Sequence, residues 1–248
     1  MRFQNNSMNF KYYKVGGCVR DFVMGIKPKD IDLLAVGGSF EELESDITSK
    51  GGEIYVSKPE YLTVRCKYPG IGPCDVRLAR TDGEYKDGRR PSQVFVAQSV
   101  EDDIRTRDFT INALLQDIET EKIIDFVGGV EDIQRRVITC VGHPKDRFGE
   151  DYLRILRAIR FAVTKGFSIG GEIQMCLKDP AMVNGLDKIS RERVREELFK
   201  MFEFSTSDSL AILDEFPLIK HKIFKNKNVF GIWLKPTLNS DCAHTGFK

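Results

Sequence analysis

Several features that would identify a class of protein at once are missing from this chain of 248 residues. Charge is balanced, with a formal net charge of +1, so no overall basic field attracts nucleic acid and such a partner would need local patches. No apolar run approaches the roughly 20 residues of a membrane span, and residues 1–10 lack the apolar core of a signal sequence. We therefore expect a protein of the cytoplasm.

Cysteine is sparse and widely spaced. It shows neither the C-x-x-C spacing of a zinc site nor the density of a secreted disulfide scaffold, so we interpret the thiols as free in a reducing compartment. The six cysteines are Cys18, Cys66, Cys74, Cys140, Cys176 and Cys242. No internal repeat or low-complexity linker is found either. With 41% hydrophobic and 30% charged residues, the chain can bury a core as one large domain or two small ones.

The first half of the chain alternates between extended and helical patterns. Residues 13–25 are typical of a strand, a Gly-Gly turn and a helix, and residues 30–37 of the next strand. Ser39 and Glu42 form the capping-box pattern of a further helix, which Gly51-Gly52 ends. Alternating apolar residues then predict strands at 60–68 and 73–81, separated by the turn "PGIGP".

From Glu101 onward the pattern becomes helical, apart from a hairpin expected at 112–129. The strongest helix is predicted over 149–166, and "RTDGEYKDGRRPSQV" is the best candidate for a mobile loop. The sequence therefore predicts an α/β half followed by a helical half.

Two aspartates one residue apart, Asp30 and Asp32, call for an explanation because like charges repel. Residues two apart on a strand project on the same face, so we expect the pair side by side at the strand's end. Asp75 could add a third carboxylate from a neighbouring strand. Magnesium is bound by one or two carboxylates plus substrate phosphates, and two metals can assist phosphoryl transfer. The alternative is a solvated strand end or turn.

The glycine turn before the first predicted helix favours an anion. Gly16 and Gly17 offer backbone N–H groups without Cβ atoms, and Arg20 follows one turn into the helix. By itself a Gly-Gly pair is weak evidence, because most such pairs are only turns.

The segment "EDYLRILRAIR" predicts a polar helix face. Asp151 and Arg154 are neighbours at i and i+3, and Arg157 and Arg160 continue along the flank. Cytosine and adenine present an amino donor beside a ring-nitrogen acceptor, whereas uracil and guanine present a ring N–H beside a carbonyl. An accepting Asp with a donating Arg fits the first pair of bases and opposes the second. The alternative is an exposed helix joined by one Asp-Arg pair.

Six motifs stand together in a fixed order between Val15 and Met201. The chain resembles the class II tRNA nucleotidyltransferases, the CCA-adding enzymes, and the related bacterial poly(A) polymerases. The motifs are "GGCVRDFVMGIKPKDIDLL", "RTDGEYKDGRRP", "RDFTINALL", "DFVGGVEDIQRRVI", "GHPKDRFGEDYLRILRAIRF" and "SRERVREELFKM". The resemblance implies a nucleotidyltransferase head of the DNA polymerase β type with helical neck, body and tail domains. It also implies untemplated addition of nucleotides to an RNA 3′ end, from CTP or ATP with Mg²⁺, in the manner of two-metal enzymes.

The resemblance also implies roles for individual residues. Asp30 and Asp32 match the metal ligands, and Asp75 matches the carboxylate that activates the RNA hydroxyl. Positions that contact the nucleotide are matched by Gly17 and Arg20, with Gly16 beside them in the same turn, and positions that recognise the ribose by Arg107, Asp108 and Asn112. The alternative for "RDFTINA" is a capped helix N-terminus. Asp151, Arg154, Arg157 and Arg160 match the amino-acid template for the incoming base.

The resemblance divides the chain into a head over residues 1–142, a neck over 143–204 and a shortened helical region over 205–248. Thr106 and Thr139 stand where the family has arginines, and the tail domain is expected to be absent. The last region joins lysines and aromatic residues, which suit either RNA contact or the packed edge of a helical bundle. These are Lys220, Lys222, Lys225, Lys227, Lys235, Phe224, Phe230 and Trp233.

We expect an enzyme that adds CMP, AMP or both to the 3′ end of tRNA. The first alternative is a poly(A) polymerase, and the second is an RNA-binding protein that keeps the fold without activity. The paired aspartates argue against the second alternative, because a binding module has no need to hold repelling carboxylates together.

Overall fold

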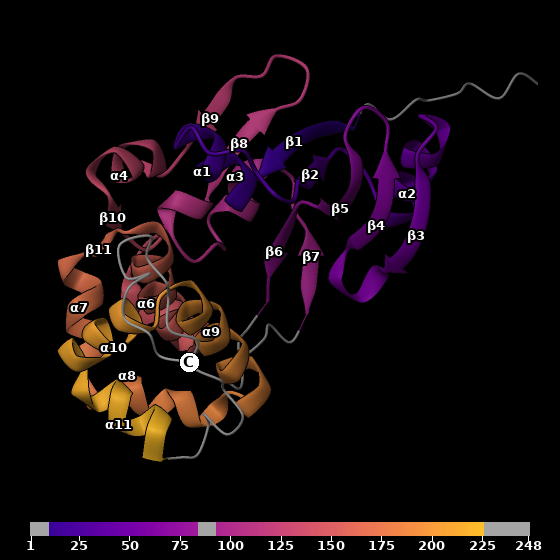
Figure 1. Cartoon of the computed structure of the whole chain (residues 1–248). Coiled ribbons are helices and arrows are strands. Elements are labelled where there is room, and N and C mark those ends of the chain that lie inside the picture. Colours follow the sequence, from indigo (N-terminus) through magenta and orange to yellow (C-terminus); the bar gives the residue numbers. More distant parts are fainter. Residues whose placement is uncertain (1–9, 84–92, 226–248) are drawn as a thin grey trace, which may run out of the picture. The chain divides into compact units, whose positions relative to one another are not determined.

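The computed structural model describes residues 10–83 and 93–225, and the structural statements below refer to these residues. The chain divides into two compact units. Among the described residues, one consists of residues 10–83 and 93–135, the other of residues 136–225. Figure 1 labels most of their elements along the chain.

The first unit is built on one mixed sheet with strand order β3-β4-β5-β2-β1-β8-β9. Strands β2 and β5 are parallel, and the other neighbouring strands are antiparallel. The strands are β1 (Lys11–Val15), β2 (Asp32–Val36), β3 (Glu53–Lys58), β4 (Thr63–Tyr68), β5 (Gly72–Leu78), β8 (Leu114–Asp117) and β9 (Ile123–Asp125), with a separate pair, β6 (Arg80–Asp82) and β7 (Val94–Val96). The predicted hairpin at 112–129 is confirmed by the pairing of β8 with β9.

Short helices connect these strands. They are α1 (Gly17–Val23), α2 (Phe40–Ser49), α3 (Val100–Ile104) and α4 (Gly129–Arg135), with the 3₁₀ turns η1 (Pro59–Tyr61) and η2 (Thr110–Asn112). The predicted capping box is confirmed at the start of α2, where the Ser39 side chain accepts from the Glu42 N–H and the Glu42 carboxylate accepts from the Ser39 N–H.

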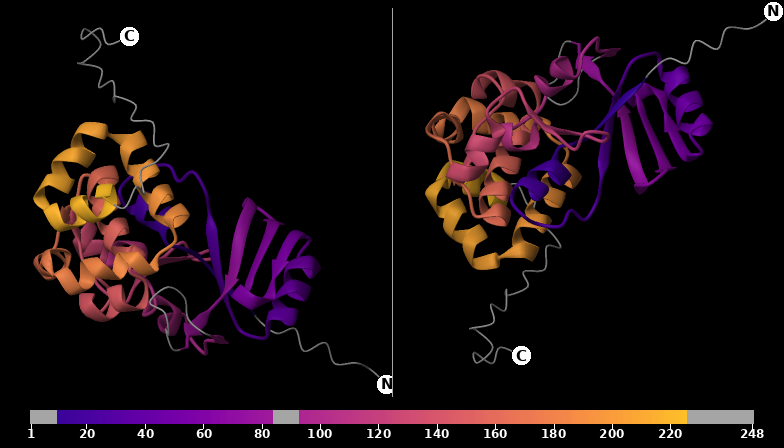
Figure 2. Two further views of the ribbon diagram at one scale, coloured as in Figure 1. Left: turned by 90° about the horizontal axis from the view of Figure 1, so that it is seen from below. Right: turned by 90° about the horizontal axis from the view of Figure 1, so that it is seen from above.

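Strand alternation decides which residues enter the core of the first unit. Leu33 of β2 and Val76 of β5 are fully buried on one face, together with Leu43 of α2. Figure 2 shows helix α2, in purple, lying along the strands at this end of the sheet. The opposite face of the same strands therefore carries the intervening residues Asp32 and Asp75.

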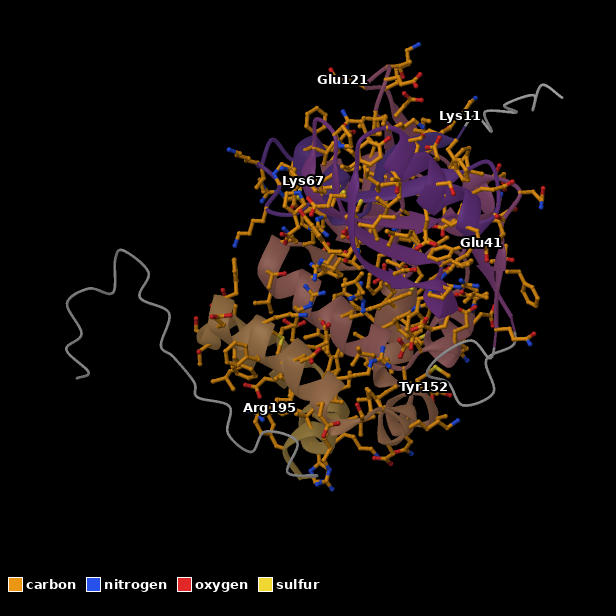
Figure 3. The ribbon with its side chains drawn as sticks, turned by 90° about the vertical axis from the view of Figure 1, so that its right-hand side faces the viewer. Lys11, Glu41, Lys67, Glu121, Tyr152 and Arg195 are labelled. Atoms are coloured by element: carbon orange, nitrogen blue, oxygen red, sulfur yellow. The ribbon has the colours of Figure 1, made fainter. Side chains whose placement is uncertain are left out.

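Strand β3 forms one edge of the sheet. It pairs with β4, and the register shifts between Ile54 and Val56, which marks a β-bulge or a similar irregularity. Tyr55 and Val56 are exposed on this strand. Elsewhere on this unit Lys11, Glu41, Lys67 and Glu121 are also exposed. Figure 3 shows Glu121 and Lys11 near the upper edge of the drawn side chains.

The second unit is a helical bundle with one short parallel strand pair, drawn mainly in orange and yellow (Figure 1). Buried apolar residues of α6, α9 and α10 form its centre, among them Ile155, Leu198 and Leu213. The elements are β10 (Val137–Ile138), α5 (Pro144–Glu150), α6 (Leu153–Lys165), β11 (Ser168–Ile169), α7 (Gly171–Lys178), α8 (Pro180–Asn184), η3 (Gly185–Lys188), α9 (Arg191–Phe204), α10 (Thr206–Glu215) and α11 (Pro217–Lys225).

The polypeptide enters the helical unit at Arg136. Strand β10 pairs with β11, and the Ser168 N–H donates to the Arg136 carbonyl over 2.8 Å. Residues 136–142 thus pack with the helices, whereas the sequence placed the end of the head at residue 142.

The predicted helix at 149–166 begins later than expected. Helix α6 starts at Leu153, and Asp151 is extended, with φ −147° and ψ 103°, at the end of α5. Its carboxylate accepts from the Leu153 N–H over 3.1 Å, which is a local bond that competes with helix formation. The placement of Asp151 and Arg154 on one continuous helix was therefore wrong.

The last described helix continues the bundle. Ile219 and Ile223 of α11 are buried, while Lys220 pairs with Asp214 and Lys222 with Asp187. The described part of the basic and aromatic segment is thus the edge of a packed bundle. The loop predicted at 80–94 begins and ends in strands, because β6 (Arg80–Asp82) pairs with β7 (Val94–Val96). Its residues 84–92, and Lys227, Phe230, Trp233 and Lys235, lie outside the described residues.

Candidate active site

The parallel pair of strands brings two of the predicted carboxylates together. Asp32, the first residue of β2, is the register partner of Asp75 on β5, so both side chains project from the same face of the sheet. Partial burial raises the pKa of Asp32, and the negative charge of Asp75 raises it further. Arg107 and Arg77 oppose this rise. The site therefore combines carboxylates that repel each other with nearby guanidinium groups.

Asp30 does not lie in the strand where the sequence placed it. It is exposed in a bend before β2, not in the strand, so alternation along a strand does not explain its position. Its charge still raises the pKa of Asp32, but this effect is smaller than that of Asp75 or of either arginine.

An arginine that the motif analysis missed lies beside Asp75. Arg65 of β4 is its antiparallel register partner, and the Arg65 Nε lies 3.1 Å from Asp75 Oδ1. Both side chains are largely exposed, so this pair contributes little to stability. It nevertheless places a positive charge next to the candidate catalytic carboxylate.

The glycine turn allows two guanidinium groups to approach the backbone. Gly16 has φ +76°, a left-handed conformation that favours glycine, and a Cβ there would lie 3.3 Å from Arg107 Nη1. A Cβ on Gly17 would lie 3.4 Å from Arg20 Nη2. The turn therefore positions Arg20 and Arg107 at the start of α1.

A buried chain of hydrogen bonds joins the turn to "RDFTINA". Arg20 Nη1 donates to Asn112 Oδ1 over 2.5 Å, and Asn112 Nδ2 donates to Asp108 Oδ1 over 3.3 Å. Asp108 Oδ1 also accepts from the Phe109 N–H. Arg107, Asp108 and Asn112, which were predicted only by resemblance, thus lie together with Arg20.

A fully buried carboxylate, Asp103, holds two arginines of this site. It accepts from Arg77 Nη2 at 3.0 and 3.2 Å, and from Arg107 Nε and Nη2 at 3.2 and 2.9 Å. The Arg80 backbone N–H donates to it as well. Burial alone would raise the pKa of Asp103, but the two arginines hold it below its ordinary value.

Asp103 and Arg77 were not predicted as site residues from the sequence. The only available signal was the acidic run that precedes "TRDF", which is also typical of an ordinary helix start. Thr106, which stands where the family has an arginine, donates its hydroxyl to the Asp103 carbonyl over 2.8 Å.

In the helical unit, the predicted base-reading residues are held in ion pairs. Asp151 accepts from Arg193 Nη2 over 2.7 Å and from Arg193 Nη1 over 3.3 Å. Arg154 is buried and pairs with Glu150 over 2.6 Å. Arg154 Nη1 also donates to the Arg147 carbonyl over 2.9 Å. Asp151 and Arg154 are thus each fixed by another residue.

The flanking arginines converge on a second buried carboxylate. Arg160 Nε lies 2.5 Å and Arg157 Nη1 3.9 Å from Glu197 of α9. Both guanidinium groups also lie over the Phe161 ring, at 4.0 Å and 5.4 Å. Arg157 and Arg160 therefore bind α6 to α9. The sequence predicted the arginines but missed Glu150, Arg193 and Glu197.

No group of three or more His, Cys, Asp or Glu residues in the described part of the chain is arranged to hold a metal ion by itself. The five described cysteines are free, as predicted, and all five are buried. No helix between residues 10 and 225, outside the gap at 84–92, is long and apolar enough to cross a membrane.

Residues 12–139, a little more than half of the chain, match the poly(A) polymerase head domain. The chain belongs to this family. Among curated proteins, the CCA-adding enzyme of Lactobacillus helveticus is 36% identical over 192 residues, which are 77% of this chain and 46% of that protein. The CCA-adding enzyme of Leuconostoc mesenteroides is 36% identical over 209 residues, or 83% and 50% of the two chains.

Solved structures of CCA-adding enzymes share the fold of this family member. The Bacillus stearothermophilus enzyme in complex with CTP has a TM-score of 0.72 and 29% identity, covering 85% of this chain and 49% of that one. The Thermotoga maritima enzyme complexed with tRNA has a TM-score of 0.69 and 27% identity, covering 88% and 49%. The predicted fold class and family resemblance are confirmed, and this chain spans about half the length of the relatives it matches.

Proposed function

We propose that this chain transfers CMP and AMP from CTP and ATP to the 3′ end of tRNA, without a nucleic-acid template. The observation that carries the proposal is the parallel register of Asp32 with Asp75, beside arginines held at the glycine turn. The relatives described above are CCA-adding enzymes, which favours CCA addition over poly(A) synthesis.

Asp30 and Asp32 are the proposed ligands of Mg²⁺, with one or two ions. The donor set fits this hard cation, because magnesium takes oxygen ligands and completes its shell with water and phosphates. Fewer than three protein ligands are then sufficient, and mutual repulsion gives the carboxylates a need for positive charge. When bound, the ion would neutralise charge on the reacting phosphates.

Asp75 is the proposed acceptor of the proton from the RNA 3′ hydroxyl, a step that would make this oxygen a better nucleophile toward the α-phosphate. Its position beside Asp32 and its partial exposure support this role.

The nucleotide is proposed to bind at the glycine turn. Gly16 and Gly17 leave room for the guanidinium groups of Arg107 and Arg20, and both can donate to phosphate or ribose oxygens. Asn112 is oriented by bonds to Arg20 and Asp108, so its contact with the ribose would be pre-organised. The same bonds make Asp108 a positioning residue.

Asp151 and Arg154 are the proposed readers of the base. An ionised carboxylate offers about four acceptor positions, and the described residues fill three of those on Asp151. The remaining position suits the amino group that C and A share. Arg157 and Arg160 are proposed to belong to the same nucleotide-binding face, where their pairs with Glu197 hold them in place.

The proposed division of labour follows a head over 1–142, a neck over 143–204 and an RNA-contacting region over 205–248. The relative from T. maritima was solved with tRNA, which supports tRNA as the partner. The cytoplasm is the proposed compartment.

Transcripts of tRNA that lack A, CA or CCA test the proposal. Each is incubated with CTP, ATP and Mg²⁺, and its 3′ end is sequenced, with Asp32→Asn as the inactive control. Completion to CCA and no further supports the proposal. Long A tails on any RNA would instead identify a poly(A) polymerase, and no addition at all would contradict nucleotidyl transfer.

A further inference from the structure

Arg77 lies on the active face of the sheet but has no role in the function proposed above. It follows Asp75 by two residues on β5 and is the register partner of Leu34, which follows Asp32 by two residues on β2. Because side chains two apart share a face, Arg77 projects from the same side as both carboxylates. Its attraction for Asp32 helps to hold down the pKa of that group.

The guanidinium of Arg77 is held at one nitrogen. Its Nη2 donates to Asp103, whereas its buried Nε has no hydrogen-bond partner among the described residues. The Arg77 side chain is 30% exposed, while that of Asp103 is fully buried. Nη2 of the arginine is therefore anchored in the protein, and the exposed part of the side chain can meet a ligand.

The charges of Asp103 and its two arginine partners do not cancel. This carboxylate holds two guanidinium groups, Arg77 and Arg107, so the three side chains together carry one excess positive charge. The two arginines also repel each other. Burial lowers the pKa of Arg107 most, and the positive charge of Arg77 lowers it further. An anion at this face would relieve that repulsion.

The positive groups are arranged along an extended path, which indicates the shape of the anion. Arg107 lies against the glycine turn, since a Cβ on Gly16 would be 3.3 Å from its Nη1. Arg107 and Arg77 both bind Asp103, so these contacts connect the glycine turn with β5. A ligand extended along this path needs several adjacent negative groups. A triphosphate has them, whereas a single backbone phosphate of RNA does not.

We propose that Arg77 binds the triphosphate of the incoming nucleotide, with Asp103 as the residue that positions it together with Arg107. This inference rests on the proposed nucleotidyl transfer and adds to it a binding residue outside the recognised motifs. A guanidinium suits the task because it presents several donors in a plane and stays charged.

The test compares binding of CTP, inorganic tripolyphosphate and cytidine to the full chain, by calorimetry. In Arg77→Gln, affinity for CTP and tripolyphosphate should fall roughly ten- to a hundredfold, the range for hydrogen bonds to charged groups. Affinity for cytidine and for RNA should stay unchanged. Arg105→Gln is the matched control, because Arg105 is an exposed arginine nearby that pairs with Glu101.

The outcomes separate the two hypotheses. If wild-type protein binds neither CTP nor ATP, the proposed function fails. If it binds CTP and Arg77→Gln retains the same CTP-to-cytidine ratio, Arg77 only supports Asp103 and the inference is wrong. A fall in RNA affinity alone would assign Arg77 to the RNA backbone and would equally overturn it.

A second measurement needs no variant, in case Arg77→Gln does not fold. Wild-type chain is treated with phenylglyoxal, which modifies accessible arginines, and the peptides are analysed by mass spectrometry. Tripolyphosphate should protect Arg77 from modification and leave Arg105 reactive. Equal modification of Arg77 with and without tripolyphosphate would contradict the proposal.

Discussion

Replacing Asp103 by asparagine tests how much the buried carboxylate contributes to the first unit. The side chain has no exposed surface and accepts hydrogen bonds from Arg77, Arg107 and the Arg80 backbone. Asparagine keeps the shape but removes the charge, and its amide N–H₂ donors oppose the donors of the arginines. Asp103→Asn therefore leaves two guanidinium groups without their counter-ion.

The loss of folding stability in Asp103→Asn is estimated from the burial of the three side chains. Removing one partner of a buried ion pair costs about 3–5 kcal/mol. The Arg77 and Arg107 side chains are 30% and 14% exposed, so both can regain some hydration. We expect the lower end, about 3 kcal/mol, because the uncompensated charges are not fully enclosed. For 150–250 residues each kcal/mol shifts Tm by about 2–4 °C, which gives roughly 6–12 °C.

Urea and thermal unfolding of the wild type and Asp103→Asn measure this difference. Glu101→Gln is the matched control, since Glu101 lies on the same helix and forms an exposed i,i+4 pair with Arg105. Such a pair is worth about 0.3–0.5 kcal/mol. A loss below about 1 kcal/mol in Asp103→Asn would refute the reasoning, because exposed pairs already reach that value.

The pH dependence provides an independent check. The pKa of Asp103 is lowered in the folded state by Arg77 and Arg107, which outweigh burial. Its stabilisation is therefore fully present above the unfolded pKa of about 3.9 and is lost as the pH falls through the lower folded value. The stability difference from Asp103→Asn should stay constant near neutral pH and shrink only in strong acid.

Three further changes test the rest of the structure. Asp32→Asn should abolish nucleotide incorporation without lowering Tm. The pKa of Asp32 is raised in the folded state, so the stability linked to this shift is present at low pH and is lost as the pH rises through the folded pKa. At neutral pH the ionised carboxylate therefore costs stability, and asparagine removes that cost. Asp151→Ala should reduce discrimination of CTP and ATP against UTP and GTP by roughly ten- to a hundredfold, measured on one RNA primer, and unchanged discrimination would remove Asp151 from base selection. Gly185→Ala should destabilise the helical unit by about 1–3 kcal/mol in thermal unfolding, because its Cβ would lie 2.0 Å from the Tyr152 ring; Gly171→Ala meets nothing within 4 Å and should be neutral or stabilising.

The sequence predicted the features that depend on local pattern. The capping box at Ser39 and the hairpin at 112–129 follow from residues close together in the chain, and both are present. The approach of Asp75 to Asp32 was foreseen only as a third carboxylate from a neighbouring strand. Its parallel register depends on how the intervening β3 and β4 fold back, which no local pattern encodes.

The partners of the charged residues could not be predicted. Asp103, Glu150 and Glu197 are acidic residues in charged helical segments, where a solvated surface position is the usual expectation. Asp103 and Glu197 are buried beside arginines that are distant in the sequence, Arg77 and Arg160. Glu150 is half-buried and pairs with Arg154 across a helix break. The break itself was missed because Asp151 bonds to the Leu153 N–H, a local alternative to the helix.

The irregular register of β3 has a consequence for solubility. This edge strand exposes Tyr55 and Val56, and among the described residues its outer side has no neighbouring strand, so a second molecule could add to it. The shift between Ile54 and Val56 interrupts the regular row of backbone donors and acceptors, and charged residues, Glu53 and Lys58, stand at both ends. The edge is therefore a poor template for intermolecular pairing, and the same hydrophobic strand without its irregularity would be prone to aggregate.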